Sequence, residues 1–295
     1  MNTSRSVVEI VPTHIVTEGG GFKVRRPFRM GKVMSPFLLI DEMGPVNYGP
    51  GEAVGAPWHP HRGFETVTYL LDGRMRHEDS AGNQGELNPG DVQWMTAGRG
   101  IIHCEEPHEE MLRDGGRTHG FQIWVNLPAS HKMMRPRYQE VPSSESPTVE
   151  KNGVWARVIA GECMGEESAI DTKIPISLIH VKMNSGSRLS QELESGLNGM
   201  IYVFGGEIEI ENETKVKINP VAFGVRAKQQ IKDGELGILS EGDVISIKSK
   251  SDSEFLILAG PELNEPISRY GPFVMNTREE IEQAFIDYRN GNFVG

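Results

Sequence analysis

Two pairs of polar side chains, each with a spacing of two residues, constrain this chain more than any other feature. His59 and His61 begin one stretch with β-strand character, and His103 and Glu105 lie on a later one. Successive side chains of a strand point to opposite faces, so residues two apart share a face. If these strands line a small barrel, the four side chains can converge on one interior point. Three imidazoles and one carboxylate are a typical ligand set for a divalent transition metal.

Short stretches rich in β-branched and aromatic residues surround these pairs. The predicted strands of this half are residues 65–71, 85–87, 91–97, 101–105 and 121–126. Turn signals separate them at intervals of about 8–12 residues, which is typical of an all-β sandwich or barrel. The dipeptide Asp72-Gly73 predicts a β-hairpin in which residues 73–77 pair back on the preceding strand.

The second half repeats parts of this pattern. VFGGEIEI at residues 203–210 is similar to YLLDGRM at 69–75, and SEGDV at 240–244 is similar to NPGDV at 88–92. We therefore predict two copies of one β-barrel. At the places of the two polar pairs, however, the second copy has residues 187–192 and 245–248, which contain no histidine.

The second copy is expected to bind no transition metal. Its one imidazole, His180, lies inside an apolar stretch, where a histidine is more often a hydrogen-bonded core residue than a ligand. The two cysteines, Cys104 and Cys163, fall one in each half. Alternation turns Cys104 away from the face of His103 and Glu105, and we predict no disulfide between the two thiols.

Domain boundaries follow from composition. Residues 133–147 hold three prolines and little apolar alternation, so a boundary is placed within them. We predict a first barrel over residues 1–135, a second over 136–270 and a C-terminal segment over 271–295. In that segment Thr277 and Glu280 have the spacing of a capping box, and the apolar residues that follow predict a packing helix over 276–290.

Charge and composition narrow the class of protein. A net charge of −11 argues against a nonspecific nucleic-acid surface, which needs clustered positive charge. The N-terminus has no apolar core of a signal peptide, and no apolar run approaches the ~20 residues of a membrane span. We expect a soluble, monomeric, intracellular protein without a membrane anchor, cytoplasmic or, in a eukaryote, also nuclear.

Four stretches of the sequence resemble one known family. HPHRGFETVTYLL at residues 59–71 and NPGDVQWMTAGRGIIH at 88–103 resemble the pirin family of the cupin superfamily. PFLLIDE at 36–42 and GPFVMNT at 271–277 resemble it as well. The resemblance therefore runs through nearly the whole chain. It implies an all-β bicupin, that is, two tandem cupin barrels of the double-stranded β-helix or jelly-roll type, with a C-terminal helix.

The resemblance also implies a metal and its ligands. Pirins usually hold Fe(II), and the matching ligands here are His59, His61, His103 and Glu105. The same donors suit Mn(II), Ni(II), Cu(II) or Zn(II). In the general cupin pattern a glutamate shortly after the histidine pair is a ligand, and Glu65 fits that place. Spacing alone leaves both glutamates open, because Glu65 also has an even separation from His61. The pirin resemblance favours Glu105 and leaves Glu65 to orient His61 or Arg62.

Two functions are implied, from different classes. Pirins are described as quercetinases, dioxygenases that open a flavonol ring with dioxygen, and Glu105 would then be the catalytic base that takes the flavonol proton. Pirins are also described as redox-sensitive regulators that bind a transcription factor or enzyme, with iron as the sensor. The feature that favours this alternative is a basic stretch, for which a solvated surface is the simpler interpretation. It contains Lys23, Arg25, Arg26, Arg29 and Lys32.

Overall fold

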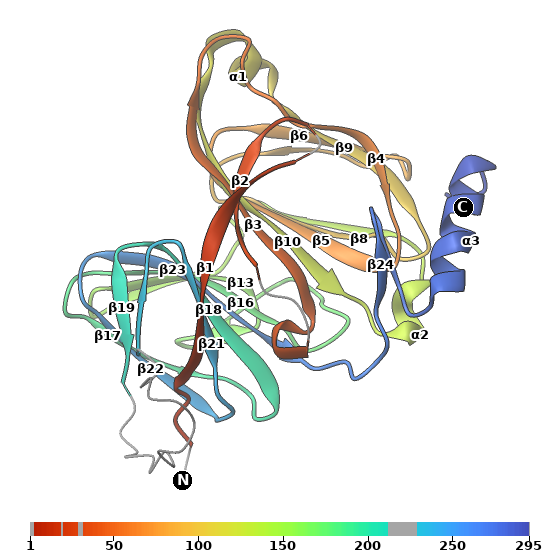
Figure 1. Cartoon of the computed structure of the whole chain (residues 1–295). Helices are drawn as coiled ribbons and strands as arrows, with labels where there is room; N and C mark the ends of the chain where they lie inside the picture. Colours follow the sequence, from red (N-terminus) through yellow and green to blue (C-terminus); the bar gives the residue numbers. More distant parts are fainter. Residues whose placement is uncertain (1–2, 19, 29–31, 212–228, 295) are drawn as a thin grey trace. The chain divides into compact units, whose positions relative to one another are not determined.

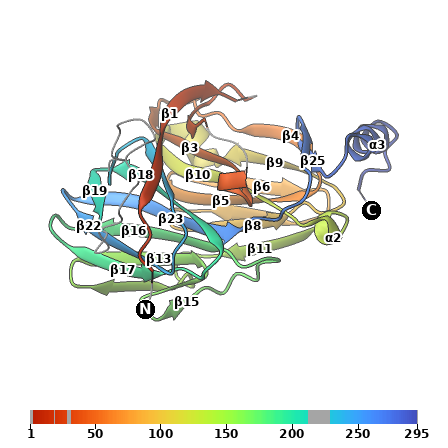
Figure 2. The same ribbon diagram turned by 60° about the horizontal axis from the view of Figure 1, so that its bottom comes forward.

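The computed structural model describes residues 3–18, 20–28, 32–211 and 229–294 (Figures 1 and 2). It consists mainly of β-strands and divides into two compact units. The first unit contains residues 14–26, 36–146 and 263–295, and the second contains residues 1–13, 27–35 and 147–262. Within the described ranges no helix is long and apolar enough to cross a membrane.

The first unit is a jelly-roll barrel of two antiparallel sheets (Figure 1). In its large sheet the strands lie in the order β11-β8-β5-β10-β3-β2, and in its small sheet in the order β4-β9-β6-β7. The large sheet comprises β2 (Lys23–Pro27), β3 (Phe37–Tyr48), β5 (Phe64–Asp72), β8 (Val92–Thr96), β10 (Gly116–Asn126) and β11 (Arg137–Val141). The small sheet comprises β4 (Ala56–His61), β6 (Met75–Asp79), β7 (Gln84–Leu87) and β9 (Ile101–Pro107). Two short helices, α1 (Glu109–Asp114) and α2 (Ala129–Lys132), connect strands of this unit.

The chain changes sheets at Asp72-Gly73, so the predicted hairpin is wrong. Strand β5 pairs with β8 and β10 in the large sheet, whereas β6 pairs with β7 and β9 in the small sheet. Gly73 has a φ of 91°, a conformation that glycine adopts readily. The dipeptide therefore provides a turn as predicted, but the turn leads the chain across the barrel to the opposite sheet.

The second unit has the same arrangement of two sheets (Figure 2). Its large sheet has the order β1-β21-β18-β23-β16-β13-β12 and its small sheet the order β17-β22-β19-β20. The large sheet comprises β1 (Val7–Thr17), β12 (Thr148–Lys151), β13 (Val154–Ala160), β16 (Ser177–Met183), β18 (Leu197–Gly205), β21 (Glu235–Leu239) and β23 (Ser253–Pro261). The small sheet comprises β17 (Arg188–Glu192), β19 (Glu207–Ile210), β20 (Gln230–Lys232) and β22 (Val244–Ser249). A 3₁₀ turn, η1 (Lys32–Met34), and a hairpin of β14 (Glu162–Cys163) and β15 (Glu166–Glu167) complete this unit.

The two units confirm the predicted internal repeat, with one correction to its alignment. Strands β18 and β19 change sheets in the same way as β5 and β6, as the similarity of residues 203–210 to 69–75 predicted. The similarity of 240–244 to 88–92 is misleading, because the former connects β21 to β22 and the latter connects β7 to β8. By sheet order β22 corresponds to β9 instead. The all-β fold of two tandem barrels with a C-terminal helix is confirmed.

The N-terminal strand belongs with the second barrel. Strand β1 pairs with β21 from Val7 to Pro12, and the side chain of Val7 is part of that unit's buried core. The units are thus interleaved along the chain, whereas the predicted domains 1–135 and 136–270 are contiguous. Hydrophobic alternation marks Val7 to Val16 as a strand but carries no information about its partner.

The C-terminal segment packs on the first unit. It forms the hairpin of β24 (Ser268–Tyr270) and β25 (Phe273–Met275), followed by α3 (Arg278–Arg289). Thr277 and Glu280 form the predicted capping box at the start of α3. Ile281 and Ala284 of the helix are buried with Phe273, Met275 and Phe293. The predicted packing helix is therefore confirmed.

Candidate metal centre and its pocket

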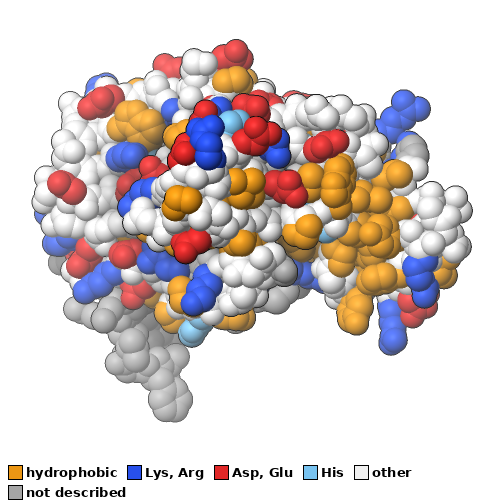
Figure 3. All heavy atoms as spheres, turned by 90° about the horizontal axis from the view of Figure 1, so that it is seen from above, with side chains coloured by type: hydrophobic (Ala, Val, Ile, Leu, Met, Phe, Trp, Pro, Cys, Tyr) orange, Lys and Arg blue, Asp and Glu red, His pale blue; other side chains and the backbone are white. Residues whose placement is uncertain are grey.

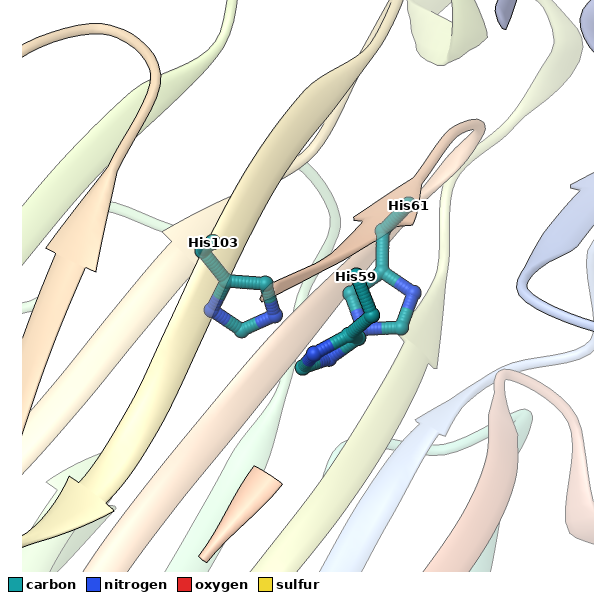
Figure 4. Close-up of side chains that lie close together, drawn as sticks. All are labelled: His59, His61 and His103. Atoms are coloured by element: carbon teal, nitrogen blue, oxygen red, sulfur yellow. The ribbon is translucent and has the colours of Figure 1, made fainter. Parts of the chain in front are cut away.

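Three histidines converge between neighbouring strands of the small sheet. Strands β4 and β9 are antiparallel, and His59 lies opposite His103 in their register. The ring centroid of His59 is 4.3 Å from that of His103 and 4.7 Å from that of His61. Figure 4 shows the three rings turned toward one another, and one nitrogen of each lies within 4.8 Å of the others. The alternation argument thus correctly placed these three side chains together.

Glu105 lies beside this cluster in a second group. One oxygen of Glu105 lies within 4.8 Å of nitrogens of His103 and of a further histidine, His77. The Thr68 hydroxyl donates a hydrogen bond to Glu105 Oε1 at 2.6 Å, which fixes the orientation of the carboxylate. His103 belongs to both groups and therefore connects Glu105 to His59 and His61. Among the described residues, Glu105 thus clusters with His103 and His77, and His59 and His61 cluster with His103.

His77 was not predicted as part of the site. It lies on β6 directly opposite Glu105 on β9, and its side chain is fully buried. The Gln93 amide nitrogen is 3.0 Å from Nδ1 of His77 and the Asp79 carboxylate is 3.5 Å from its Nε2. The Gln93 amide and the Asp79 carboxylate therefore flank the two ring nitrogens of His77. His77 is hence held between neighbours and packs beside His103, with their Nδ1 atoms 3.5 Å apart.

Burial keeps two of the convergent imidazoles, His61 and His103, neutral. Desolvation, with a smaller effect of His59, lowers the pKa of His61 to about 3. Desolvation and the neighbouring histidines also lower the pKa of His103 well below its ordinary value. A neutral imidazole is the form that binds a metal. The Nε2 atom of His103 is buried without a hydrogen-bond partner in the described structure, an arrangement that is rare unless an ion or water completes it. The donor set therefore fits a transition metal.

Glu65 occupies a different environment. It is fully buried on β5, and the Thr96 hydroxyl donates to its Oε1 at 2.6 Å. Among the described residues, Glu65 belongs to neither group of clustered ligand atoms. Its role in orienting His61 or Arg62 stays a prediction. Glu105 as the fourth ligand likewise stays a prediction.

Backbone groups of the C-terminal segment contact His61 and its neighbour Arg62. The Pro272 carbonyl lies 3.3 Å from Nδ1 of His61, and the Val274 N–H donates to the Arg62 carbonyl at 3.0 Å. Gly63 follows with a φ of 90°, and a Cβ atom there would lie 2.0 Å from the Val274 carbonyl oxygen. Any larger residue would displace this contact. The histidine pair is thus positioned by the tail of the chain.

A buried lysine fastens the same segment. The Lys132 ammonium donates to the carbonyl oxygens of Gly63 and Val274 at 2.7 and 3.0 Å and to Asn126 Oδ1 at 2.6 Å. Lys132 is 1% exposed. Burial lowers its pKa to about 8. Nothing in the sequence pattern marked this lysine, because two of its three acceptors, the carbonyls of Gly63 and Val274, lie far from it in sequence.

A pocket of about 560 Å³ leads to the cluster. His59, His61 and Glu105 line it, and most of its other walls are apolar or aromatic, including Phe22, Trp58 and Trp124. Hydrophobic side chains gather on the molecular surface over β4 and β24 (Figure 3). An apolar pocket with a few convergent polar groups at one end is typical of a small-molecule site.

The basic stretch is largely neutralised within the first unit. Arg25 makes a two-pronged ion pair with Glu42, and Arg26 pairs with Asp41 and Glu18. Arg29 and the side chain of Lys32 lie outside the described residues. Arg25 and Arg26 of this stretch are therefore neutralised by carboxylates of the same unit.

The barrel interior of the second unit is filled with aliphatic side chains. Ile208, Ile210, Ile245 and Ile247 of its small sheet are all buried. His180 lies outside this core, with its Nε2 2.9 Å from Glu254, as expected for a hydrogen-bonded histidine. Cys104 and Cys163 are both buried free thiols.

Comparisons with known proteins agree with this architecture. A family model described as Pirin matches residues 21–125, and one described as Pirin C-terminal cupin domain matches residues 178–294. Human Pirin is 41% identical over 295 residues, covering 98% of this chain and 94% of its own. Pirin-like protein 2 of Arabidopsis thaliana is 38% identical, covering 98% of this chain and 85% of its own.

Solved structures give the same result. A crystal structure of quercetin 2,3-dioxygenase from Acinetobacter baumannii has a TM-score of 0.89 and 35% identity, covering 99% of both chains. The bacterial pirin YhhW of Escherichia coli, in complex with nickel(II), has a TM-score of 0.61. That protein covers 86% of this chain and 98% of its own, and at 19% identity it supports the fold alone.

Proposed function

Because this chain belongs to the pirin family of bicupins, we propose that it is a metal-dependent dioxygenase that opens flavonols such as quercetin. The observation that carries the proposal is the convergence of three imidazoles at a largely apolar pocket large enough for a planar aromatic ligand. The name of the Acinetobacter structure supports the choice of substrate. His59, His61, His103 and Glu105 are proposed as ligands, with Fe(II) as the usual metal of the family.

The metal would supply Lewis acidity to a chelating hydroxyl and carbonyl of the substrate. The rest of the proposed reaction depends on the chain's own residues. Glu105 lies at the end of the pocket and accepts the hydroxyl proton of the substrate, while the Thr68 hydroxyl holds the carboxylate in place. The apolar walls exclude water and orient the rings. The buried histidines stay neutral and so do not compete for that proton.

The test is aerobic turnover of quercetin. Protein loaded with Fe(II) is mixed with quercetin, and the loss of flavonol absorbance is compared with that caused by the same concentration of free iron. We expect the flavonol absorbance to fall faster with the protein than with free iron. We also expect the His59→Ala/His61→Ala variant to fall to the rate of free iron. A wild-type rate equal to that of free iron would contradict the proposed function.

The regulatory alternative finds no support in the described residues. Its one sequence feature was the basic stretch, and the arginines of that stretch for which the structure gives contacts are ion-paired within the first unit. A partner protein therefore stays a prediction from the family resemblance.

A further inference from the structure

An arginine that pairs with no carboxylate of the described residues lies in the wall of the same pocket. Arg269, on β24, lines the pocket together with His61 and Trp124. Its guanidinium carbon is 4.7 Å from the centroid of the Trp124 ring, and its Nη1 donates to the Leu38 carbonyl at 3.2 Å. The guanidinium thus lies over an aromatic ring and donates to one backbone carbonyl among the described residues, and a guanidinium carries five N–H donors in all.

The two other arginines that line the pocket are already ion-paired. Arg26 pairs with Asp41 and Glu18, and Arg74 pairs with Glu86 and Glu110. Arg269 makes no ion pair with any residue that the structure describes. Burial and the nearby positive charge of Arg26 lower the pKa of Arg269, partly opposed by Asp41 and Glu18. A partly desolvated cation of this kind gains most from an anion that arrives with the ligand.

Arg269 is also close to the candidate metal centre. The ring of Trp124 packs edge-on against His61, with centroids 5.2 Å apart, and the guanidinium of Arg269 contacts the same indole. A single aromatic side chain therefore separates the two groups. A planar ligand of two or three fused or linked rings that begins at the histidines can reach Arg269 with its other end.

We propose that Arg269 binds an acidic substituent of the substrate, so that the preferred substrates are planar aromatic chelators that carry a carboxylate or an ionised phenol away from the chelating end. The chelating end rests on the proposed function, whereas the acidic end rests on Arg269. Guanidinium is planar and presents paired N–H donors, which suits two-pronged binding of a carboxylate. Arg269 is thus a specificity-determining residue.

The experiment compares a neutral and an acidic ligand. Protein loaded with Zn(II), a metal without redox chemistry, is titrated with 3-hydroxyflavone and with two carboxylated isomers, one substituted on the phenyl ring and one on the fused ring. Binding is followed by tryptophan fluorescence, since Trp58 and Trp124 line the pocket. We expect at least one carboxylated isomer to bind about 10- to 100-fold more weakly to Arg269→Met than to wild type. Neutral 3-hydroxyflavone should change less than about threefold.

Matched variants separate recognition from packing. Arg74→Met removes an arginine that lines the same pocket but is ion-paired, and it should not discriminate between the ligands. Arg269→Lys keeps the charge and should recover part of the preference. An equal loss for neutral and carboxylated ligands would make Arg269 a packing residue only, and no loss for either isomer would place the acidic group elsewhere; both results overturn the inference.

The outcome is independent of turnover. If the iron-loaded protein fails to consume quercetin but carboxylate binding still depends on Arg269, the dioxygenase proposal fails and the acidic subsite stands. If quercetin is consumed and Arg269→Met binds every ligand as wild type does, the subsite fails alone.

Discussion

The two barrels of this protein share one strand arrangement but enclose opposite chemistry. In the first unit, paired strands β4 and β9 bring His59 opposite His103. In the second unit, the corresponding strands β17 and β22 are also antiparallel and bring Gln191 opposite Ile245 and Leu189 opposite Ile247. The His103 and Glu105 pair of β9 is matched on β22 by Ile245 and Ile247, which have the same spacing and are fully buried.

This difference shows that the site is a property of a few inward-facing side chains and not of the fold. An interior of isoleucine, valine and leucine stabilises a barrel directly through apolar burial. The polar interior gains less from burial and must be held by specific contacts, here Thr68, Gln93 and the C-terminal segment around Pro272. The first unit therefore depends on a network of polar contacts that the second unit does not need.

The sharpest test of the comparison is metal content. We predict one transition metal per chain after loading, because the convergent donor atoms described by the structure all belong to the first unit. The His59→Ala/His61→Ala variant should lose this metal entirely, as measured by elemental analysis after gel filtration. Two metals per chain in the wild type, with one retained by the variant, would show that the second barrel also has a site.

The next test concerns the fourth ligand. We predict that Glu105→Ala abolishes dioxygenase activity and greatly weakens iron binding, because the change removes both a donor atom and a compensating charge. Glu65→Ala should keep its iron and lose only about 10- to 100-fold in activity, the usual effect of a residue that supports a ligand. Iron affinity and turnover are measured for both. An iron-free Glu65→Ala beside a loaded Glu105→Ala would reverse the assignment.

Particular residues show how much of the site and the fold could be predicted from the sequence. Alternation places two side chains of one strand on one face, and so it correctly grouped His59 with His61 and His103 with Glu105. The capping box likewise identified α3. Alternation does not reveal which strands are neighbours. The neighbouring strands determine which other side chains contact the site. His77 enters the site only because β6 pairs with β9, and Lys132 matters only because carbonyls far from it in sequence meet at its ammonium.

Two predictions from short sequence motifs were wrong because such motifs do not reveal which strands pair. Asp72-Gly73 specifies a turn but not the sheet to which the chain returns, and the short motif at residues 240–244 matched a turn of the wrong strand pair. The two signals describe two and five residues, whereas sheet membership is decided by contacts between residues far apart in sequence.

A smaller effect is expected from a core substitution in the second unit, whose barrel interior is aliphatic. We predict that Ile247→Ala destabilises the second unit by about 2–5 kcal/mol, because it leaves a cavity in a fully buried core. Metal affinity of the first unit should remain unchanged. Hydrogen exchange resolved by mass spectrometry should show lost protection in peptides from residues 147–262. Valine at the same position provides the control, with an expected cost of about 0.5–1.5 kcal/mol. A large loss of metal affinity in Ile247→Ala would mean that the two interiors are not independent.

The smallest predicted effect is a difference in how the buried cations of the two units, Arg5 and Lys132, make stability depend on pH. In the second unit Arg5 is 0% exposed and donates to the carbonyls of Leu197 and Gly242. An arginine stays charged at every relevant pH. In the first unit the buried Lys132 likewise donates to carbonyl oxygens, but burial lowers its pKa to about 8 from the ordinary 10.5. Between these values the unfolded chain holds a proton that the folded chain has released, so stability rises with pH.

The contribution of Lys132 should therefore be complete above pH 10.5 and lost as the pH falls through about 8. We predict that the free energy of unfolding of wild type rises relative to Lys132→Met by at most about 1.4 kcal/mol per pH unit across this window. Urea unfolding at several pH values, followed by tryptophan fluorescence, measures the difference. The fluorescence reports mainly the first unit, because Trp58, Trp94 and Trp124 belong to it and only Trp155 to the second. Parallel pH profiles of wild type and Lys132→Met would show that the three acceptors of the ammonium hold its pKa near the ordinary value, and the two buried cations would then be equivalent.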